Sequence, residues 1–179
     1  MKTLSDHILD IIQNSLNAKS TLVEILVKTD QKSDLCTVKI KDNGCGMSSE
    51  VLKQATNSFF TTRKTRRVGL GLSLLKQNAE MTNGEFNIQS KPGKGTTVEA
   101  IFRLSHIDRP QLGDIWNTFY LSMLGNENVE LIYEHITDNG SFKISSAEIR
   151  DSIEGVSMQQ PDIGKAITDF IENNIKNIQ

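Results

Sequence analysis

Apolar residues recur every three or four positions along residues 4–19, which is the spacing of one face of an α-helix. Thr3 and Asp6, at the start of this segment, form a capping-box pattern that predicts the helix N-terminus. The opposite face carries a polar stripe formed by His7, Asp10, Asn14 and Asn17. A polar helix face is usually just solvated, but such faces carry mostly Lys and Glu. This short-chained, amide-rich stripe therefore favours a face that lines a site.

Residues 22–28 and 35–41 follow the alternating pattern of two β-strands joined by a polar turn. Asp42 continues the apolar register of the second strand, so strand geometry turns its carboxylate toward the interior. A buried carboxylate is costly unless it is hydrogen-bonded, and we expect a donor opposite it, such as the exocyclic amine of a base. The run Asp42-x-Gly44-x-Gly46 by itself is equally typical of a turn between a strand and a helix.

A basic, hydroxyl-rich segment over residues 57–67 precedes a second pair of glycines. Such a segment is usually a solvated loop, but its place before Gly69 and Gly71 favours a lid over phosphates. These glycines open a predicted helix that runs to about Met81 and has Gly84 as its C-cap. A glycine-rich helix N-terminus is a natural anion site. The spacing fits neither the dinucleotide-binding fingerprint nor the Walker P-loop.

Two further strands are predicted over residues 85–90 and 98–104, with Phe86 and Ile88 facing inward on the first. Thr96 shares the inward register of the second strand, which would bring its side chain beside Asp42.

The pattern changes after residue 104, where a small α/β unit begins. A helical stretch is followed by a strand over residues 129–135, a hairpin turn at Asp138-Asn139-Gly140 and a final helix after Pro161. We therefore divide the chain into residues 1–104 and a C-terminal appendage of residues 105–179, either docked on the first part or separate.

The formal net charge of −2 over 179 residues gives no sign of a nucleic-acid or membrane-surface partner. No stretch approaches the roughly 20 apolar residues that span a bilayer. The two cysteines, Cys36 and Cys45, lack the spacing of a disulfide framework or of a zinc site. We therefore expect a cytoplasmic protein that binds neither nucleic acid nor membrane.

Several short motifs stand in a fixed order along the first part of the chain. They are Asp10-x-x-x-Asn14, Asp42-x-Gly44-x-Gly46, Phe59-Phe60-Thr61-Thr62-Arg63, and Gly69-Leu70-Gly71-Leu72 followed by Gly93-x-Gly95-Thr96-Thr97. Together they resemble the ATP-binding motifs of the gyrase, histidine-kinase and MutL-type (GHKL) ATPase superfamily. The resemblance implies the Bergerat fold, an α+β two-layer sandwich with a mixed sheet and helices on one face, here extended by the small α/β appendage.

The resemblance also implies ATP and Mg²⁺ as cofactors. In the superfamily the Asn of the first motif binds magnesium, which implies Asn14, and the Asp of the second receives the adenine amino group, which implies Asp42. Thr96 would help to hold adenine through water, and Gly69 and Gly71 would meet the phosphates. The other motif residues that we expect around the nucleotide are Asn17, Ala18, Gly44, Gly46, Met47, Phe60, Thr62, Lys64, Leu70 and Leu72.

Two residues are candidates for the chemistry itself. Arg63, in the predicted lid, occupies the place of the superfamily's basic residue that neutralises the γ-phosphate. Asp10 occupies the place of the Glu that activates water in the hydrolytic members, and its shorter side chain has less reach. His7 lies on the same stripe and is interpreted as a pocket residue or an alternative proton acceptor, because the H-E-x-x-P phospho-acceptor signature is absent.

These features favour a stand-alone protein kinase or regulatory phosphotransferase that uses Mg-ATP on a separate protein, by resemblance to the compact anti-sigma serine kinases. The alternative is an ATP-gated protein-binding module with slow or no hydrolysis, for which the appendage would be the docking surface. A third hypothesis is a degenerate fold that binds no nucleotide.

Overall fold

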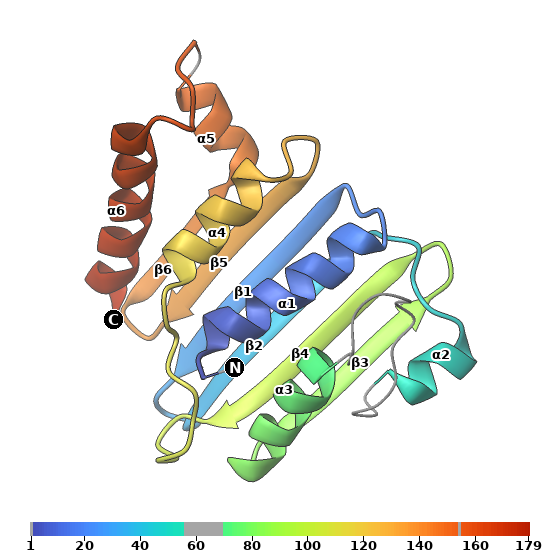
Figure 1. The fold of residues 1–179 in the computed structure, drawn as a ribbon. Helices are drawn as coiled ribbons and strands as arrows, with labels where there is room; N and C mark the ends of the chain where they lie inside the picture. Colours follow the sequence, from blue (N-terminus) through green and yellow to red (C-terminus); the bar gives the residue numbers. More distant parts are fainter. Residues whose placement is uncertain (1, 56–69, 154) are drawn as a thin grey trace.

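The described residues form one mixed β-sheet of six strands with helices packed over one face (Figure 1). The computed structural model describes residues 2–55, 70–153 and 155–179. The order of strands across the sheet is β3 (Glu85–Lys91), β4 (Gly95–Arg103), β2 (Leu35–Asp42), β1 (Leu22–Asp30), β5 (Glu130–Thr137) and β6 (Gly140–Ser145). This architecture confirms the predicted α+β two-layer fold.

Helix α1 (Leu4–Asn17) lies over the sheet and packs against α3 (Leu70–Met81) on one side and α4 (Ile115–Leu124) on the other (Figure 1). The helix α6 (Pro161–Ile178) packs against α4 and β6. The short helices are α2 (Ser49–Gln54), beside β3, and α5 (Ser146–Ser152), which follows β6. No helix among the described residues is both long enough and apolar enough to cross a lipid bilayer.

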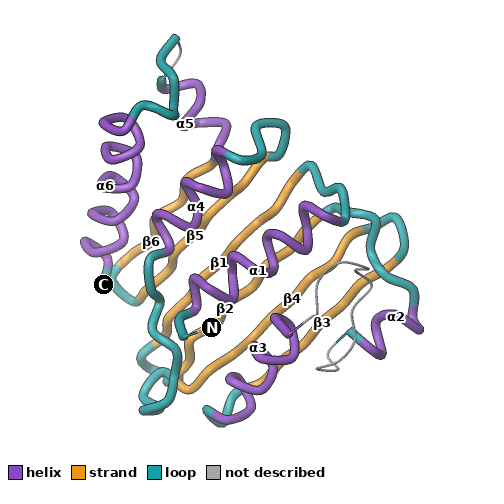
Figure 2. The backbone as a smooth tube through the Cα atoms, in the orientation of Figure 1, coloured by secondary structure: helices purple, strands orange, loops and turns teal. Residues whose placement is uncertain are grey.

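Strand β1 lies in the middle of the sheet, between β2 and β5 (Figure 2). It pairs antiparallel with β2 and parallel with β5, so that Ile25 lies opposite both Ile40 and Tyr133. The C-terminal segment is therefore docked, because it continues the sheet of the first 104 residues through β1. The placing of a domain boundary at residue 104 stays a prediction.

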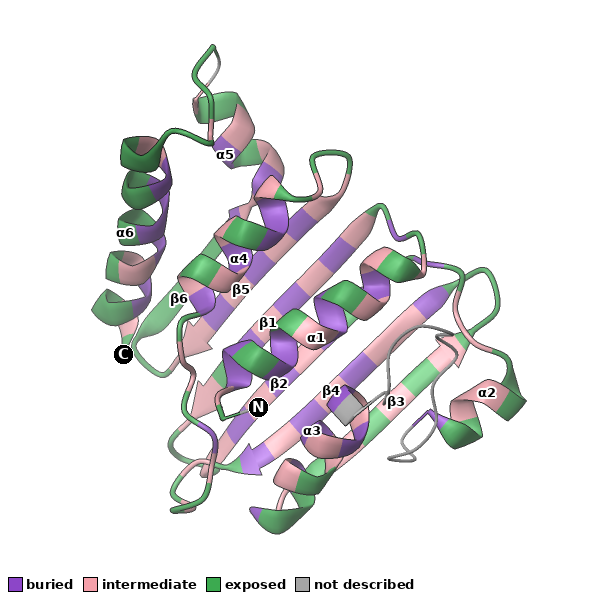
Figure 3. Cartoon of the chain, viewed as in Figure 1, coloured by how far each residue is buried: buried purple, intermediate pink, exposed green. Residues whose placement is uncertain are grey.

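One face of the sheet is apolar and buried, and along β1, β2, β4 and β5 its side chains alternate with partly exposed ones (Figure 3). The buried apolar positions on the strands are Val23, Ile25, Val27, Cys36, Val38, Ile40, Val98, Ala100, Phe102, Leu131, Tyr133 and Ile144. On the opposite face Lys41 pairs with Glu24 at 2.9 Å and Lys39 pairs with Glu99 at 3.3 Å. The alternation therefore decides which side chains reach the helices and which remain in water.

The first turn of α1 is held by its N-terminal capping box and by hydrogen bonds to residues 111 and 112. The predicted capping box is present, since Thr3 Oγ1 accepts from Asp6 N and Asp6 accepts from Thr3 N. Leu4 N donates to Gln111 O at 2.8 Å, and the next amide of the helix, that of Ser5, donates to Leu112 O at 2.9 Å. The segment ahead of α4 is thus hydrogen-bonded to α1, and we call this contact the α1–linker junction.

Helix α3 ends differently from the prediction that Gly84 is its C-cap. Asn83 takes the left-handed conformation, with φ +55°, and its amide donates to Glu80 O at 3.2 Å. Gly84 N donates to Ala79 O at 2.9 Å, which completes a Schellman motif around Asn83. Gly84 is instead required by a close approach to β4, because a Cβ atom there would lie 2.7 Å from the carbonyl carbon of Ile101.

The predicted hairpin between β5 and β6 is confirmed, since Thr137 and Gly140 pair across a two-residue turn. The end of α6 is tied to this turn. Thr137 Oγ1 donates to Ile178 O, and Asn139 Nδ2 donates to Gln179 O at 3.2 Å. The C-terminal end of the final helix is therefore fixed to the turn that joins the last two strands.

Candidate functional site

Asp42 is the last residue of β2, and its side chain is buried, with 8% of its surface exposed. Ser15 Oγ donates to Asp42 Oδ2 at 2.9 Å. The amides of Gly44 and Thr96 donate to Oδ1 at 2.8 Å and 3.3 Å. A carboxylate offers about four acceptor positions, two on each oxygen. The described residues thus fill both positions of Oδ1 and one of Oδ2, which leaves one acceptor position on Oδ2 for a ligand.

The loop after Asp42 is held between the end of α1 and the β3–β4 hairpin. Cys45 N donates to Ala18 O at 2.9 Å, and Gly93 N donates to Cys45 O at 2.7 Å. Gly46 has φ +66°, which favours glycine, and a Cβ atom there would also overlap with the backbone of Lys91. A Cβ atom on Gly44 would lie 2.8 Å from Ala18 Cβ. The glycines of this loop therefore let its backbone approach its neighbours closely.

Ser90, near the end of β3, connects this loop to the start of β4. Its Oγ accepts from Met47 N at 2.8 Å, lies 3.0 Å from Gly95 O and lies 2.9 Å from Thr96 Oγ1. Thr96 was expected beside Asp42. Its backbone amide donates to Asp42, and its hydroxyl contacts Ser90.

The polar stripe of α1 reaches this site through two of its members. Asn14 directly precedes Ser15, which contacts Asp42, and Asn14 Nδ2 donates to Asp10 Oδ2 at 3.3 Å. Asn17 is exposed, and its amide nitrogen donates to Gln13 O within the same helix. Asp10 and Asn14 thus form a polar region next to Ser15, the partner of Asp42, whereas Asn17 is exposed to solvent.

Gly71 of α3 packs on this region. A Cβ atom on Gly71 would overlap with the carboxylate of Asp10, lying 2.5 Å from its Cγ. Leu70 begins the helix, and Leu72 packs against the apolar core. The absence of a side chain at Gly71 therefore lets the first turn of α3 lie directly against Asp10, the acidic residue of the stripe.

His7 lies in the interface of α1 with α3 and is 1% exposed. Its Nε2 lies 2.9 Å from Asn78 Nδ2 of α3, so the ring accepts a hydrogen bond there. Burial lowers the pKa of His7. The residue interpreted from the sequence as lining a pocket thus joins two helices as a neutral, buried imidazole.

Five predicted site residues lie outside the described residues. They are Phe60, Thr62, Arg63, Lys64 and Gly69. The predicted lid, its basic residue and the first glycine of the phosphate motif therefore stay predictions.

A family model described as "Histidine kinase-, DNA gyrase B-, and HSP90-like ATPase" matches residues 2–106. The matched segment contains Asp10, Asn14, Asp42, Gly71 and Thr96, the residues that the fold gathers around β2 and α1. The chain belongs to this family. The superfamily resemblance seen in the sequence motifs is confirmed.

Relatives of this ATPase-family chain include bacterial proteins named as a sensor protein and as a histidine-protein kinase. A "Putative sensor protein" of Shewanella frigidimarina (strain NCIMB 400) is 44% identical over 107 residues, which cover 59% of this chain and 16% of the relative. The "Signal transduction histidine-protein kinase AtoS" of Escherichia coli (strain K12) is 34% identical over 103 residues, covering 57% and 17%. The chain thus spans about a sixth of the length of these two relatives.

A solved structure titled "Crystal Structure of N terminal domain of a DNA repair protein" shares the fold, with a TM-score of 0.57 and 16% identity. The matched region covers 81% of the present chain and 52% of the chain in that solved structure. The likeness in fold is therefore longer than the segment matched by the family model and extends beyond residue 106.

Sequence reasoning missed two residues of the site, Ser15 and Ser90. The signal for Ser90 was present, since it shares the predicted inward register of Phe86 and Ile88. Ser15 lies beside the polar stripe of α1 rather than on it, and only the packing of α1 on β2 shows that its hydroxyl meets Asp42.

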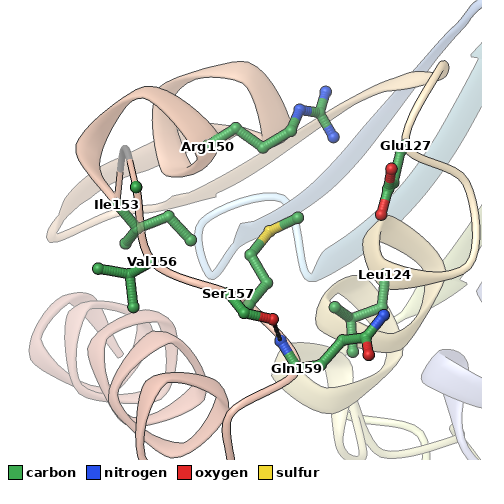
Figure 4. A pocket seen from close by; sticks show the side chains of 9 residues that line it. Leu124, Glu127, Arg150, Ile153, Val156, Ser157 and Gln159 are labelled. Atoms are coloured by element: carbon green, nitrogen blue, oxygen red, sulfur yellow. Dashed lines mark hydrogen bonds between the residues drawn. The ribbon is translucent and has the colours of Figure 1, made fainter.

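A cavity of about 290 Å³ lies elsewhere, between the end of α4 and the segment after α5 (Figure 4). Leu124, Glu127 and Met158 line it together with Arg150, whose Nη2 donates to Ser146 Oγ at 3.0 Å. Arg150 Nη1 is enclosed by protein and has no hydrogen-bond partner among the described residues. The cavity lies toward β6, whereas the Asp42 site borders β3 and β4 at the opposite side of the sheet (Figure 1). It is not part of that site.

Proposed function

We propose that this chain binds ATP at the Asp42 site. The observation that carries the proposal is the carboxylate of Asp42, buried and held by three protein donors, with one acceptor position left on Oδ2. The amino group of adenine supplies one N–H to such a position. A base with an oxygen there would place a lone pair against the carboxylate, and the cost of an unsatisfied buried polar group disfavours it.

Asn14 fits the magnesium ion that the family implies. Mg²⁺ bound with a nucleotide takes one or two protein oxygens, the phosphates and water. Because Asn14 Nδ2 donates to Asp10, its amide presents Oδ1 as the oxygen on the other side. When bound, the metal would neutralise charge on the phosphates. The chain's own contribution is to hold that amide in place through Asp10, which in turn lies against Gly71.

For the reaction, we propose transfer of the γ-phosphoryl group to a separate protein, in the cytoplasm. The relative named as a histidine-protein kinase supports this class of reaction. Asp10 lies beside Asn14 and is the candidate base for the acceptor hydroxyl. Arg63 is the candidate counter-charge for the γ-phosphate. Cys36 and Cys45 are both free, as expected for a reducing compartment.

Calorimetric titration with ATP and magnesium tests binding. We expect wild type to bind and Asp42→Asn, which replaces an acceptor oxygen by a donor, to lose at least about tenfold in affinity, the equivalent of ~1.4 kcal/mol. Asp169→Asn, at an exposed position of α6, is the matched control and should bind as wild type does. Equal affinities of wild type and Asp42→Asn would refute the site.

Transfer is tested with γ-labelled ATP and purified candidate proteins, beginning with those encoded beside this one. Label should move to one of them with wild type and fail to move with Asp10→Asn. If wild type binds ATP but labels none of the candidates, the kinase proposal is abandoned in favour of the second one.

The second candidate function is an ATP-gated binding module. The α1–linker junction favours it, because the helix that carries Asp10 and Asn14 is hydrogen-bonded to the segment leading into α4. A ligand shifts only an equilibrium between states that it distinguishes. Amide hydrogen exchange of residues 105–145, measured with ATP and with ADP, should therefore differ. Identical exchange in the two states would rule out gating through this junction.

A further inference from the structure

Ser90 Oγ meets three polar groups that belong to different parts of the site. Met47 N, in the loop after β2, lies at 2.8 Å. Gly95 O, at the start of β4, lies at 3.0 Å, and Thr96 Oγ1 lies at 2.9 Å. A hydroxyl has one proton to donate and two lone pairs that accept. The three contacts therefore use the whole hydrogen-bonding capacity of Ser90.

The direction of each bond follows from counting protons. Met47 N–H can only donate, so it takes one lone pair of Ser90 Oγ. Gly95 O can only accept, so it takes the single proton of Ser90. The contact with Thr96 is then a hydrogen bond only if the Thr96 hydroxyl donates to the remaining lone pair of Ser90.

We infer that Ser90 is a positioning residue that fixes the Thr96 hydroxyl as an acceptor toward the ligand. The inference rests on the proposed function, in which adenine occupies the Asp42 site. Thr96 N donates to Asp42 itself, so the Thr96 side chain lies next to the group that Asp42 receives. With its proton turned to Ser90, Thr96 Oγ1 has only lone pairs left to offer a ligand bound at Asp42.

The base-recognising end of the site is then lined by acceptors alone, from Asp42 and Thr96. It suits a purine with an exocyclic amine at position 6 and disfavours a 6-oxopurine, whose oxygen would meet lone pairs from both residues. Ser90 thereby contributes to base selectivity without touching the base. A serine that only stabilised the loop would weaken all purine nucleotides equally.

The test compares ATP with inosine triphosphate, which carries an oxygen at position 6, by calorimetry on wild type and four variants. In Ser90→Ala the Thr96 hydroxyl is released and can donate to that oxygen. We expect the ATP-to-ITP affinity ratio to fall about fivefold, within the range of one neutral hydrogen bond. Ser90→Thr keeps the hydroxyl and should keep the wild-type ratio.

Thr96→Val and the double variant Ser90→Ala/Thr96→Val complete a cycle. Without the Thr96 hydroxyl, Ser90→Ala should leave the ATP-to-ITP ratio unchanged, even if affinity for both nucleotides falls through the Met47 loop. An unchanged ratio in the single Ser90→Ala variant, or an equal fall in the Thr96→Val background, overturns the role of Ser90. Failure of wild type to bind ATP overturns the proposed function instead, so the two failures are distinct.

Discussion

Gly71 of α3 lies against the carboxylate of Asp10 on α1, and a Cβ atom at Gly71 would overlap with it. Because Asp10 also accepts from Asn14 Nδ2, anything that displaces its carboxylate disturbs the amide proposed to bind magnesium. Inserting a methyl group into a packed interface costs about 1–3 kcal/mol. We therefore expect Gly71→Ala to weaken binding of Mg-ATP by about tenfold, measured by calorimetry.

Gly125→Ala is the control for that substitution. Gly125 follows α4 in a right-handed conformation, with φ −76°, and the nearest atom to an added Cβ lies at an ordinary 3.6 Å. Its ATP affinity should equal that of wild type. If Gly71→Ala also binds as wild type does, Asp10 and α3 can separate without loss, and the proposed coupling through Gly71 is wrong.

Ser15→Ala removes a buried hydroxyl that donates to Asp42 Oδ2. Hydrogen bonds to charged groups contribute about 1.5–3 kcal/mol, so we expect the free energy of unfolding to fall by about 2 kcal/mol. Urea denaturation followed by circular dichroism measures it. Ser141→Ala, on an exposed position of β6, should change that free energy by less than about 0.5 kcal/mol.

The α1–linker junction can be loosened at Gly113. This residue has φ +74°, and a Cβ atom there would lie 2.6 Å from Thr3 Cβ and 2.5 Å from Ser5 Oγ. Gly113→Ala is expected to lower the free energy of unfolding by about 2–3 kcal/mol, from backbone strain and overlap together. Gly155→Ala is the informative comparison, because Gly155 has a similar φ of +81° but nothing within 4 Å of its added Cβ. Gly155→Ala should lower the free energy of unfolding by less than Gly113→Ala does. Equal decreases in the two variants would show that crowding at the junction contributes nothing.

The stability of the fold should depend on pH through His135. Tyr133 OH and His135 Nδ1 are 2.7 Å apart in the core, and burial lowers the pKa of His135 to about 4. In the unfolded chain His135 is protonated near the ordinary histidine pKa of 6.5, whereas in the folded chain it is protonated only near pH 4. The free energy of unfolding should therefore fall as the pH drops through this window, by about 2 kcal/mol between roughly pH 7.5 and pH 5.

His135→Asn, which keeps an acceptor near the position of Nδ1, should remove most of that slope in urea titrations. Burial also lowers the pKa of His7, which contributes with the same sign, so a residual slope is expected. Asp6, Asp30 and Asp34 have pKa values lowered from 3.8 by hydrogen bonds and titrate below the window. An undiminished slope in His135→Asn would assign the effect to other groups.

The sequence predicted the site best where periodicity alone decides which way a side chain points. The alternation along β2 turned Asp42 inward, and the helical spacing of α1 placed Asp10 and Asn14 on one face. It could not show that β5 pairs with β1, because a parallel pairing between distant segments leaves no local pattern. The same reason applies to Ser15, whose partner is on another element.

Gly71 shows a different kind of gap between sequence and structure. A glycine-rich helix N-terminus indicates an anion site, and the superfamily resemblance implies that Gly71 meets the phosphates. The packing adds a second reason for the missing side chain, the carboxylate of Asp10, which no spacing rule contains. Gly71 is thus constrained both by the phosphate-binding motif and by its packing against Asp10. Only the motif can be recognised in the sequence.

The position of β1 between β2 and β5 also affects how the chain folds and how a truncated chain aggregates. A polypeptide cut after residue 104 would leave one side of β1 as a row of unpaired backbone donors and acceptors, and open edges of this kind promote self-association. Pairing β1 with β5 requires closing a long loop, which slows folding relative to local hairpins. Residues from both halves of the chain are therefore expected to unfold together in a single cooperative transition, and the ATPase-family segment gains its full solubility only once the last strands have been added.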